Sequence, residues 1–95
     1  MKLRYTEQAQ ADIDTTVDWY EGQSRGLGLK FLSNVEDVIE RILEHPKLYS
    51  VKRKRLRGTS IKIFPFTIFY SIEKAIIVIH SVFDDRQNPE KRPDL

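Results

Sequence analysis

Cysteine is absent from this chain of 95 residues, so disulfide bonds and thiolate metal ligands are excluded. No apolar run approaches the roughly 20 residues that a membrane-spanning helix requires. Residues 1–5 carry no long apolar stretch, and we expect no secretion signal. The sequence contains no repeat, low-complexity segment or internal linker. We therefore expect a single domain over residues 1–95 that works in a reducing cytoplasm.

The composition is that of a folded protein, with 40% hydrophobic and 32% charged residues. A domain of this length buries about two-thirds of the surface that its unfolded chain exposes, so its core is thin. A deep, enclosed substrate pocket does not fit such a core. We expect function to depend on a surface, a shallow groove or a partner.

Charge is unevenly distributed although the net charge is only +2. Residues 7–21 contain five acids and no base: Glu7, Asp12, Asp14, Asp18 and Glu21. Residues 52–57 contain five bases and no acid: Lys52, Arg53, Lys54, Arg55 and Arg57. This asymmetry indicates an acidic or polyanionic partner for one face of the molecule. The alternative interpretation is a solvated basic loop.

The first half of the sequence predicts a strand and two helices. Residues 2–5 alternate between polar and apolar, which is typical of a short strand. Thr6 is a favourable N-cap for an amphipathic helix that we expect to end at Gly22. A second helix is predicted over residues 27–45, where apolar residues form two adjacent stripes before Pro46. The short loop between the helices predicts an antiparallel helix hairpin.

The second half predicts three antiparallel strands, over residues 56–64, 66–72 and 75–83. A tight turn at Glu73-Lys74 would pair three sets of core-facing residues: Ile72 with Ala75, Tyr70 with Ile77, and Ile68 with Ile79. The opposite face, with His80 beside Thr67, would be open or covered by a partner. The expected fold class is α+β, with an N-terminal strand, an antiparallel helix hairpin and a three-stranded antiparallel meander.

Short motifs along the chain resemble the RelE/ParE superfamily of bacterial toxins. They are Tyr5-Thr6 with Asp12-Ile13 and Trp19-Tyr20, Gly26-Leu27-Gly28 before Phe31-Leu32, Phe64-Pro65-Phe66, and Val82-Phe83-Asp84 before Arg86-Gln87-Asn88-Pro89. Each motif is unspecific alone, whereas their order and spacing together are specific and cover nearly the whole chain.

The resemblance implies the toxin of a bacterial type II toxin–antitoxin pair, similar to plasmid stabilisation proteins. It also implies a cognate antitoxin that wraps the toxin with a helix and an extended segment. ParE-like members inhibit DNA gyrase through protein contacts, whereas RelE-like members cut messenger RNA on the ribosome. We expect the ParE-like activity, with a ribosome-dependent endoribonuclease as the alternative. No cofactor or metal is expected, because the sequence has no metal-ligand spacing, phosphate-binding glycine loop or nucleophilic triad.

A ribonuclease would need an acid–base group and cations around one phosphate. The candidates are Arg57, His80 and Arg86, together with Lys54 and Tyr70. His80 suits proton transfer because histidine titrates near neutral pH. The alternative for His80 is a structural role, bonded to a neighbour such as Thr67.

The end of the last predicted strand departs from the ribonuclease pattern. Many RNA-cleaving relatives carry a histidine or an added arginine where this chain has Asp84 and Gln87. Asp84 and Asp85 would repel a phosphate unless they were paired with Arg86. Arg86 is therefore interpreted either as a functional cation or as a partner of one aspartate that orders the tail.

Partner contacts are predicted at the basic run and at Trp19. The basic run comprises Lys52, Arg53, Lys54, Arg55 and Arg57. It has three interpretations: contact with ribosomal or messenger RNA, docking on an acidic surface of gyrase, or binding the acidic part of an antitoxin. Trp19 lies at the edge of the first helix's apolar stripe and is predicted to anchor a partner, whereas Tyr20 belongs to the core.

Overall fold

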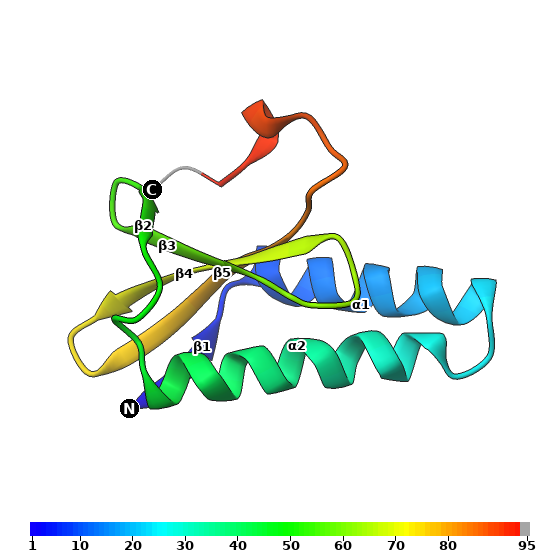
Figure 1. The fold of residues 1–95 in the computed structure, drawn as a ribbon, viewed down its shortest axis with the longest axis horizontal. Helices are drawn as coiled ribbons and strands as arrows, with labels where there is room; N and C mark the ends of the chain where they lie inside the picture. Colours follow the sequence, from blue (N-terminus) through cyan, green and yellow to red (C-terminus); the bar gives the residue numbers. More distant parts are fainter. Residues whose placement is uncertain (94–95) are drawn as a thin grey trace.

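The computed structural model describes residues 1–93, so the last two residues of the predicted domain lie outside the described part. The elements follow the order β1 (Lys2–Tyr5), α1 (Glu7–Gln23), α2 (Leu27–Glu44), β2 (Val51–Arg53), β3 (Leu56–Ser60), β4 (Phe66–Glu73), β5 (Ile76–Asp84) and the 3-10 turn η1 (Pro89–Lys91). One sheet has the strand order β1-β5-β4-β3-β2, in which only β1 and β5 are parallel. Both helices lie on one side of it and residues 85–93 on the other (Figure 1). The predicted α+β fold is confirmed.

The start of α1 is as predicted, because the Oγ1 of Thr6 accepts a hydrogen bond of 3.1 Å from the backbone N–H of Ala9. The predicted end at Gly22 is wrong by one residue. The helix continues through Gln23, and the backbone N–H of the C-cap Ser24 still bonds to the helix. None of the helices in residues 1–93 is long and apolar enough to cross a bilayer.

The helix hairpin is closed by a carboxylate and a glycine. The two carboxylate oxygens of Glu21 accept hydrogen bonds from the backbone N–H groups of Gly26 and Gly28, at 2.9 and 3.0 Å. These N–H groups lie at the start of α2, where no residue of the helix itself can pair with them. A Cβ at Gly28 would lie 2.6 Å from the carbonyl oxygen of Val17, so glycine permits the close approach of the helices.

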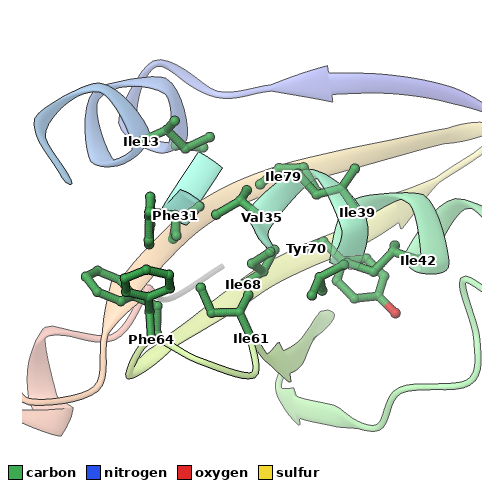
Figure 2. Close-up of a cluster of buried hydrophobic side chains, with 14 of the residues drawn as sticks. Ile13, Phe31, Val35, Ile39, Ile42, Ile61, Phe64, Ile68, Tyr70 and Ile79 are labelled. Carbon is green, nitrogen blue, oxygen red and sulfur yellow. The ribbon is translucent and has the colours of Figure 1, made fainter. Parts of the chain in front are cut away.

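The core lies between the helix hairpin and one face of the sheet, which we call the helix-covered face. It is filled by large side chains from both layers, including Ile13, Phe31, Val35, Ile39, Ile42, Ile61, Phe64, Ile68, Tyr70 and Ile79 (Figure 2). Burying each such side chain contributes about 1.5–3 kcal/mol before the cost of ordering the chain. The predicted core positions Ile68, Tyr70, Ile77 and Ile79 are all fully buried.

The predicted pairing of the last two strands is wrong, and Ala75, which was expected to face the core, is an exposed turn residue. The other predicted core-facing residues of these strands lie on the expected face. The turn is centred on Lys74 and Ala75 rather than on Glu73 and Lys74, and Lys74 adopts a left-handed φ of 58°. Ile72 therefore faces Ile77, a shift of two residues, and such a shift leaves every side chain on its own face. The register then shifts again at a bulge.

The bulge places an extra residue, His80, between the pairs formed by Ile79 and by Ser81. After the bulge the alternation of β5 is reversed, so Phe83 lies on the opposite face of the sheet from the helices. We call this side the helix-free face. A small second cluster of Leu56, Phe69 and Phe83 is buried there.

Two further strand boundaries differ from the prediction. The strand expected over residues 56–64 ends at Ser60. The backbone N–H of Ile61 donates to the carbonyl of Phe66 and closes a loop that contains Pro65, which has no N–H for a strand ladder. Conversely, Val51–Arg53 forms the edge strand β2, which was not predicted. All three of its residues are exposed, so it lacks the apolar alternation that indicates a strand.

Candidate functional site

The structure separates the three predicted catalytic residues. Arg57 is on the helix-covered side, where its guanidinium donates to the carbonyl oxygens of Tyr49, at 2.7 Å, and Lys47, at 3.3 Å. Beside it the hydroxyl of Tyr70 donates to the carbonyl of Pro46 at 2.6 Å, and burial raises its pKa. Both candidates therefore fasten the segment between α2 and β2 to the sheet.

His80 belongs to a hydrogen-bonded chain on the helix-free face. Its Nε2 lies 2.8 Å from the hydroxyl of the fully buried Ser71, which donates to the carboxylate of Glu73 at 2.7 Å. Because the hydroxyl proton of Ser71 is given to Glu73, Nε2 of His80 must be the donor, which leaves Nδ1 as the acceptor. The pairing expected with Thr67 is wrong, since the register places Ser71 nearer.

Burial is the main cause that lowers the pKa of His80. The negative charge of Glu73 opposes that effect, and the charges of Arg4 and Arg55 add to it. The hydrogen bond from Ser71 lowers the pKa of Glu73. Burial and the two arginines therefore favour the neutral imidazole, whereas Glu73 favours the protonated one.

Arg86 lies beyond β5 and is held by Asp84. Its guanidinium donates two hydrogen bonds of 2.9 Å to the two carboxylate oxygens, and its backbone N–H donates a third. This pairing lowers the pKa of Asp84 and raises that of Arg86. The guanidinium carbon also stands 6.0 Å from the ring centre of Phe66. Asp85 does not join this pair and accepts a hydrogen bond of 2.7 Å from the hydroxyl of Thr67.

An open strand edge lies between α1 and the end of β5. The strand β1 ends at Tyr5, opposite Ile79, so the following residues of β5 have no neighbouring strand on that side. Asp12 of α1 occupies this position, and its carboxylate accepts hydrogen bonds of 3.0 Å from the backbone N–H of Val82 and the hydroxyl of Ser81. Sequence reasoning missed this role, although Asp12 stands three residues after the buried Ala9 and so adjoins the apolar side of the helix.

A cleft with a volume of about 560 Å³ opens beside this edge. It is lined by α1 and by the end of the sheet, with Trp19, Phe66, Val82, Asp84 and Arg86 among its walls. Trp19 is 58% exposed, while its neighbour Tyr20 is buried, as predicted. The cleft thus brings together two predicted functional residues, Trp19 and Arg86. Its charged groups Asp12, Asp84 and Arg86 already have partners within the chain.

The predicted basic run does not form one surface. Lys52 lies along the helix-free face, since a Cβ added to Gly58 would come 3.0 Å from its Cγ. Arg55 acts on Glu73 and His80 of the same face. Arg57 turns to the helix-covered side, whereas Lys54 occupies the β2–β3 turn with a left-handed φ of 51°. Within residues 1–93, no group of histidine and acidic side chains is placed to hold a metal ion.

Comparisons with known proteins agree with the fold. The family model described as "ParE toxin of type II toxin-antitoxin system, parDE" matches residues 3–89. A solved structure described as "Chromosomal ParDE TA system from P. aeruginosa" is similar, with a TM-score of 0.74 at 20% sequence identity. That match covers 88% of this chain and 95% of the other. No curated protein matches the sequence significantly.

Proposed function

This chain belongs to the family of ParE toxins of type II toxin–antitoxin systems, and we propose that it arrests bacterial growth by inhibiting DNA gyrase through protein contacts. In this proposal it acts in the cytoplasm, without a cofactor, until a cognate antitoxin neutralises it. The observation that carries the proposal is the separation of Arg57, His80 and Arg86. Arg57 is bonded to the segment between α2 and β2, His80 lies beside Ser71 on the helix-free face, and Arg86 lies beside Asp84 beyond β5. An RNA-cleaving site needs such groups around one phosphate.

Purified protein added to a gyrase supercoiling reaction tests the proposed activity. We expect supercoiling to fall at the concentrations that arrest growth, and DNA synthesis to stop before protein synthesis when the chain is induced alone. Unchanged supercoiling at those concentrations would contradict the proposal. The reaction contains no ribosomes, so a ribosome-dependent activity cannot account for the inhibition.

We propose that the antitoxin covers the cleft at Trp19. The side chain of Trp19 is exposed next to the apolar walls Phe66 and Val82, and the charges in the cleft have partners. An aromatic anchor beside a largely neutral cleft suits the apolar side of a partner segment. We further propose that exposed Arg55, which directly precedes β3, contacts an acidic surface of gyrase.

Substitution of Trp19 tests the antitoxin contact separately from the gyrase contact. We expect Trp19→Ala to weaken antitoxin binding by at least tenfold, because truncated anchors of this kind cost about 2 kcal/mol or more. Leu29→Ala is the matched control, since Leu29 is 69% exposed on the other helix. Equal affinities of the two variants would show that the antitoxin binds elsewhere.

A ribosome-dependent endoribonuclease is the second candidate. The chain of His80, Ser71 and Glu73 favours it, because it offers an acceptor nitrogen with Arg4 and Arg55 close enough to act on its charge. In this case His80→Ala and Arg86→Ala should abolish toxicity and messenger RNA cleavage. Full toxicity of both variants would exclude the site.

A further inference from the structure

A second, smaller pocket lies on the helix-free face, away from the cleft at Trp19. Its volume is about 240 Å³, and its walls include the cations Lys52 and Arg92, the hydroxyl-bearing Ser60 and Thr67, and the ring of Phe69. Among residues 1–93, no acidic side chain is part of its walls. Lysine and arginine with serine and threonine hydroxyls are the groups that proteins use to contact phosphate oxygens.

Packing fixes the direction of Lys52. Its stem crosses β3 at Gly58, where a Cβ would come 3.0 Å from the Cγ of Lys52 and 3.2 Å from the ring of Phe69. Glycine at this position therefore lets the aliphatic stem lie on the sheet while the ammonium group reaches the pocket. Arg92 comes from the C-terminal segment, which passes over the same face (Figure 1). Two distant parts of the chain thus supply the two cations.

Positive charge continues across the face beyond this pocket. Arg55 and Arg4 both act electrostatically on Glu73 and His80, which lie on the helix-free side. Arg4 is on β1 and Lys52 on β2, at opposite edges of the five-stranded sheet. Neighbouring strands are about 4.8 Å apart, so these cations span about 19 Å, far more than one phosphate group.

The aromatic residues of this face are not available for base stacking. Phe69 and Phe83 are 4% and 6% exposed. Proteins that hold single strands stack bases on exposed aromatic rings, whereas contacts to duplex DNA are made mainly to the backbone. The arrangement therefore fits phosphates of a duplex better than a single strand.

We propose that the pocket of Lys52 and Arg92 binds a backbone phosphate of duplex DNA and that the helix-free face lies along the duplex. This contact goes beyond the protein contacts proposed for gyrase inhibition, and it would act on DNA that gyrase holds. Asp85 borders the pocket through its bond to Thr67 and weakens the contact. The structure thus assigns opposite effects to Lys52 and Asp85.

The test uses the full chain and a short fluorescent DNA duplex, with affinity measured by anisotropy over a range of salt concentrations. Lys52→Gln and Arg92→Gln should each weaken binding several-fold and make the log–log salt slope shallower by about 0.9, the value for one lost phosphate contact. Asp85→Asn should tighten binding. Lys30→Gln on α2 is the matched control, because it removes the same charge on the other side of the sheet.

Several outcomes would overturn the proposal. Equal losses for Lys30→Gln and Lys52→Gln would show attraction to net charge alone. Displacement of the duplex by inorganic phosphate, but not by chloride of equal ionic strength, would identify a site for free phosphate. Tighter binding of single-stranded RNA would favour the ribonuclease, and binding of polyglutamate without DNA would identify an acidic protein partner.

The supercoiling assay keeps this inference separate from the proposed function. Gyrase inhibition by a protein that does not bind duplex DNA would refute the DNA contact alone. Salt-dependent duplex binding that follows Lys52, Arg92 and Asp85, without gyrase inhibition, would refute the proposed function and leave the DNA contact in place.

Discussion

The two faces of the sheet differ in the side chains that cover them, although the same strands supply both. On the helix-covered face, aromatic and branched side chains fill the space under α2, and the ring centres of Tyr20 and Phe64 are 4.7 Å apart. On the helix-free face the described residues form one small buried cluster, Leu56, Phe69 and Phe83, next to the polar chain that ends at Glu73. The helix-covered face buries most of the apolar side chains, so we expect it to contribute most of the stability of the fold.

The largest expected effect tests the helix-covered face. Phe31 is fully buried and touches the rings of Phe64 and Phe66 edge-on, so Phe31→Ala should cost about 3–5 kcal/mol of unfolding free energy. Phe83→Ala on the helix-free face should cost less, about 3 kcal/mol, because the small cluster can collapse around the space. Urea unfolding measures both. A larger loss for Phe83→Ala would reverse the roles assigned to the two faces.

The next effect concerns the edge where the two layers meet. Asp12→Ala removes the acceptor of the Val82 N–H and the Ser81 hydroxyl, and leaving such part-buried donors unpaired costs about 1–3 kcal/mol. Asp14→Ala is the control, since within residues 1–93 the Asp14 carboxylate is bonded to the exposed Gln10. Equal unfolding free energies for the two variants would show that water replaces Asp12 at the strand edge.

The fold was largely predictable because its signals are local. Thr6 marks the start of α1 by its own side chain, and the period of the apolar residues predicts α2. The face of the sheet also follows from alternation alone, which is why Tyr70 and Ile79 were placed in the core. Their register could not be predicted, because the turn is formed by Lys74 in a left-handed conformation, which lysine rarely adopts.

The sites were less predictable because they depend on contacts between residues far apart in the sequence. The bond of Asp12 to Val82 joins positions 70 residues apart, and it exists only because β1 ends early. The shifted register places His80 beside Ser71, whereas Thr67 pairs with Phe83. A run of basic residues predicts local charge but not the face to which each side chain points. Lys52 and Arg57 lie on the neighbouring strands β2 and β3 and point to opposite faces, and β2 was not predicted.

A smaller effect distinguishes a structural Arg86 from a functional one. Arg86 keeps the pKa of Asp84 below its ordinary value, so the pair contributes stability above about pH 4 that is lost as the pH falls towards the folded pKa. The arginine is 58% exposed, which limits the contribution to about 1 kcal/mol or less. Asp84→Asn should therefore reduce the loss of unfolding free energy that accompanies a fall in pH below about 4. An unchanged loss would show that the pair does not order the tail.

The smallest effect concerns the polar chain of the helix-free face and is measured as a pKa. The pKa of His80 is lower in the folded protein than the ordinary 6.5, so between these values the unfolded chain binds more protons. Stability should consequently fall as the pH drops through 6.5 and level off below the folded pKa. Because the charge of Glu73 raises the pKa of His80, Glu73→Gln should lower that pKa further in an NMR titration. Glu40→Gln, on α2, should leave the pKa of His80 unchanged. Equal pKa shifts in Glu73→Gln and Glu40→Gln would mean that His80 responds to overall charge rather than to its hydrogen-bonded neighbours.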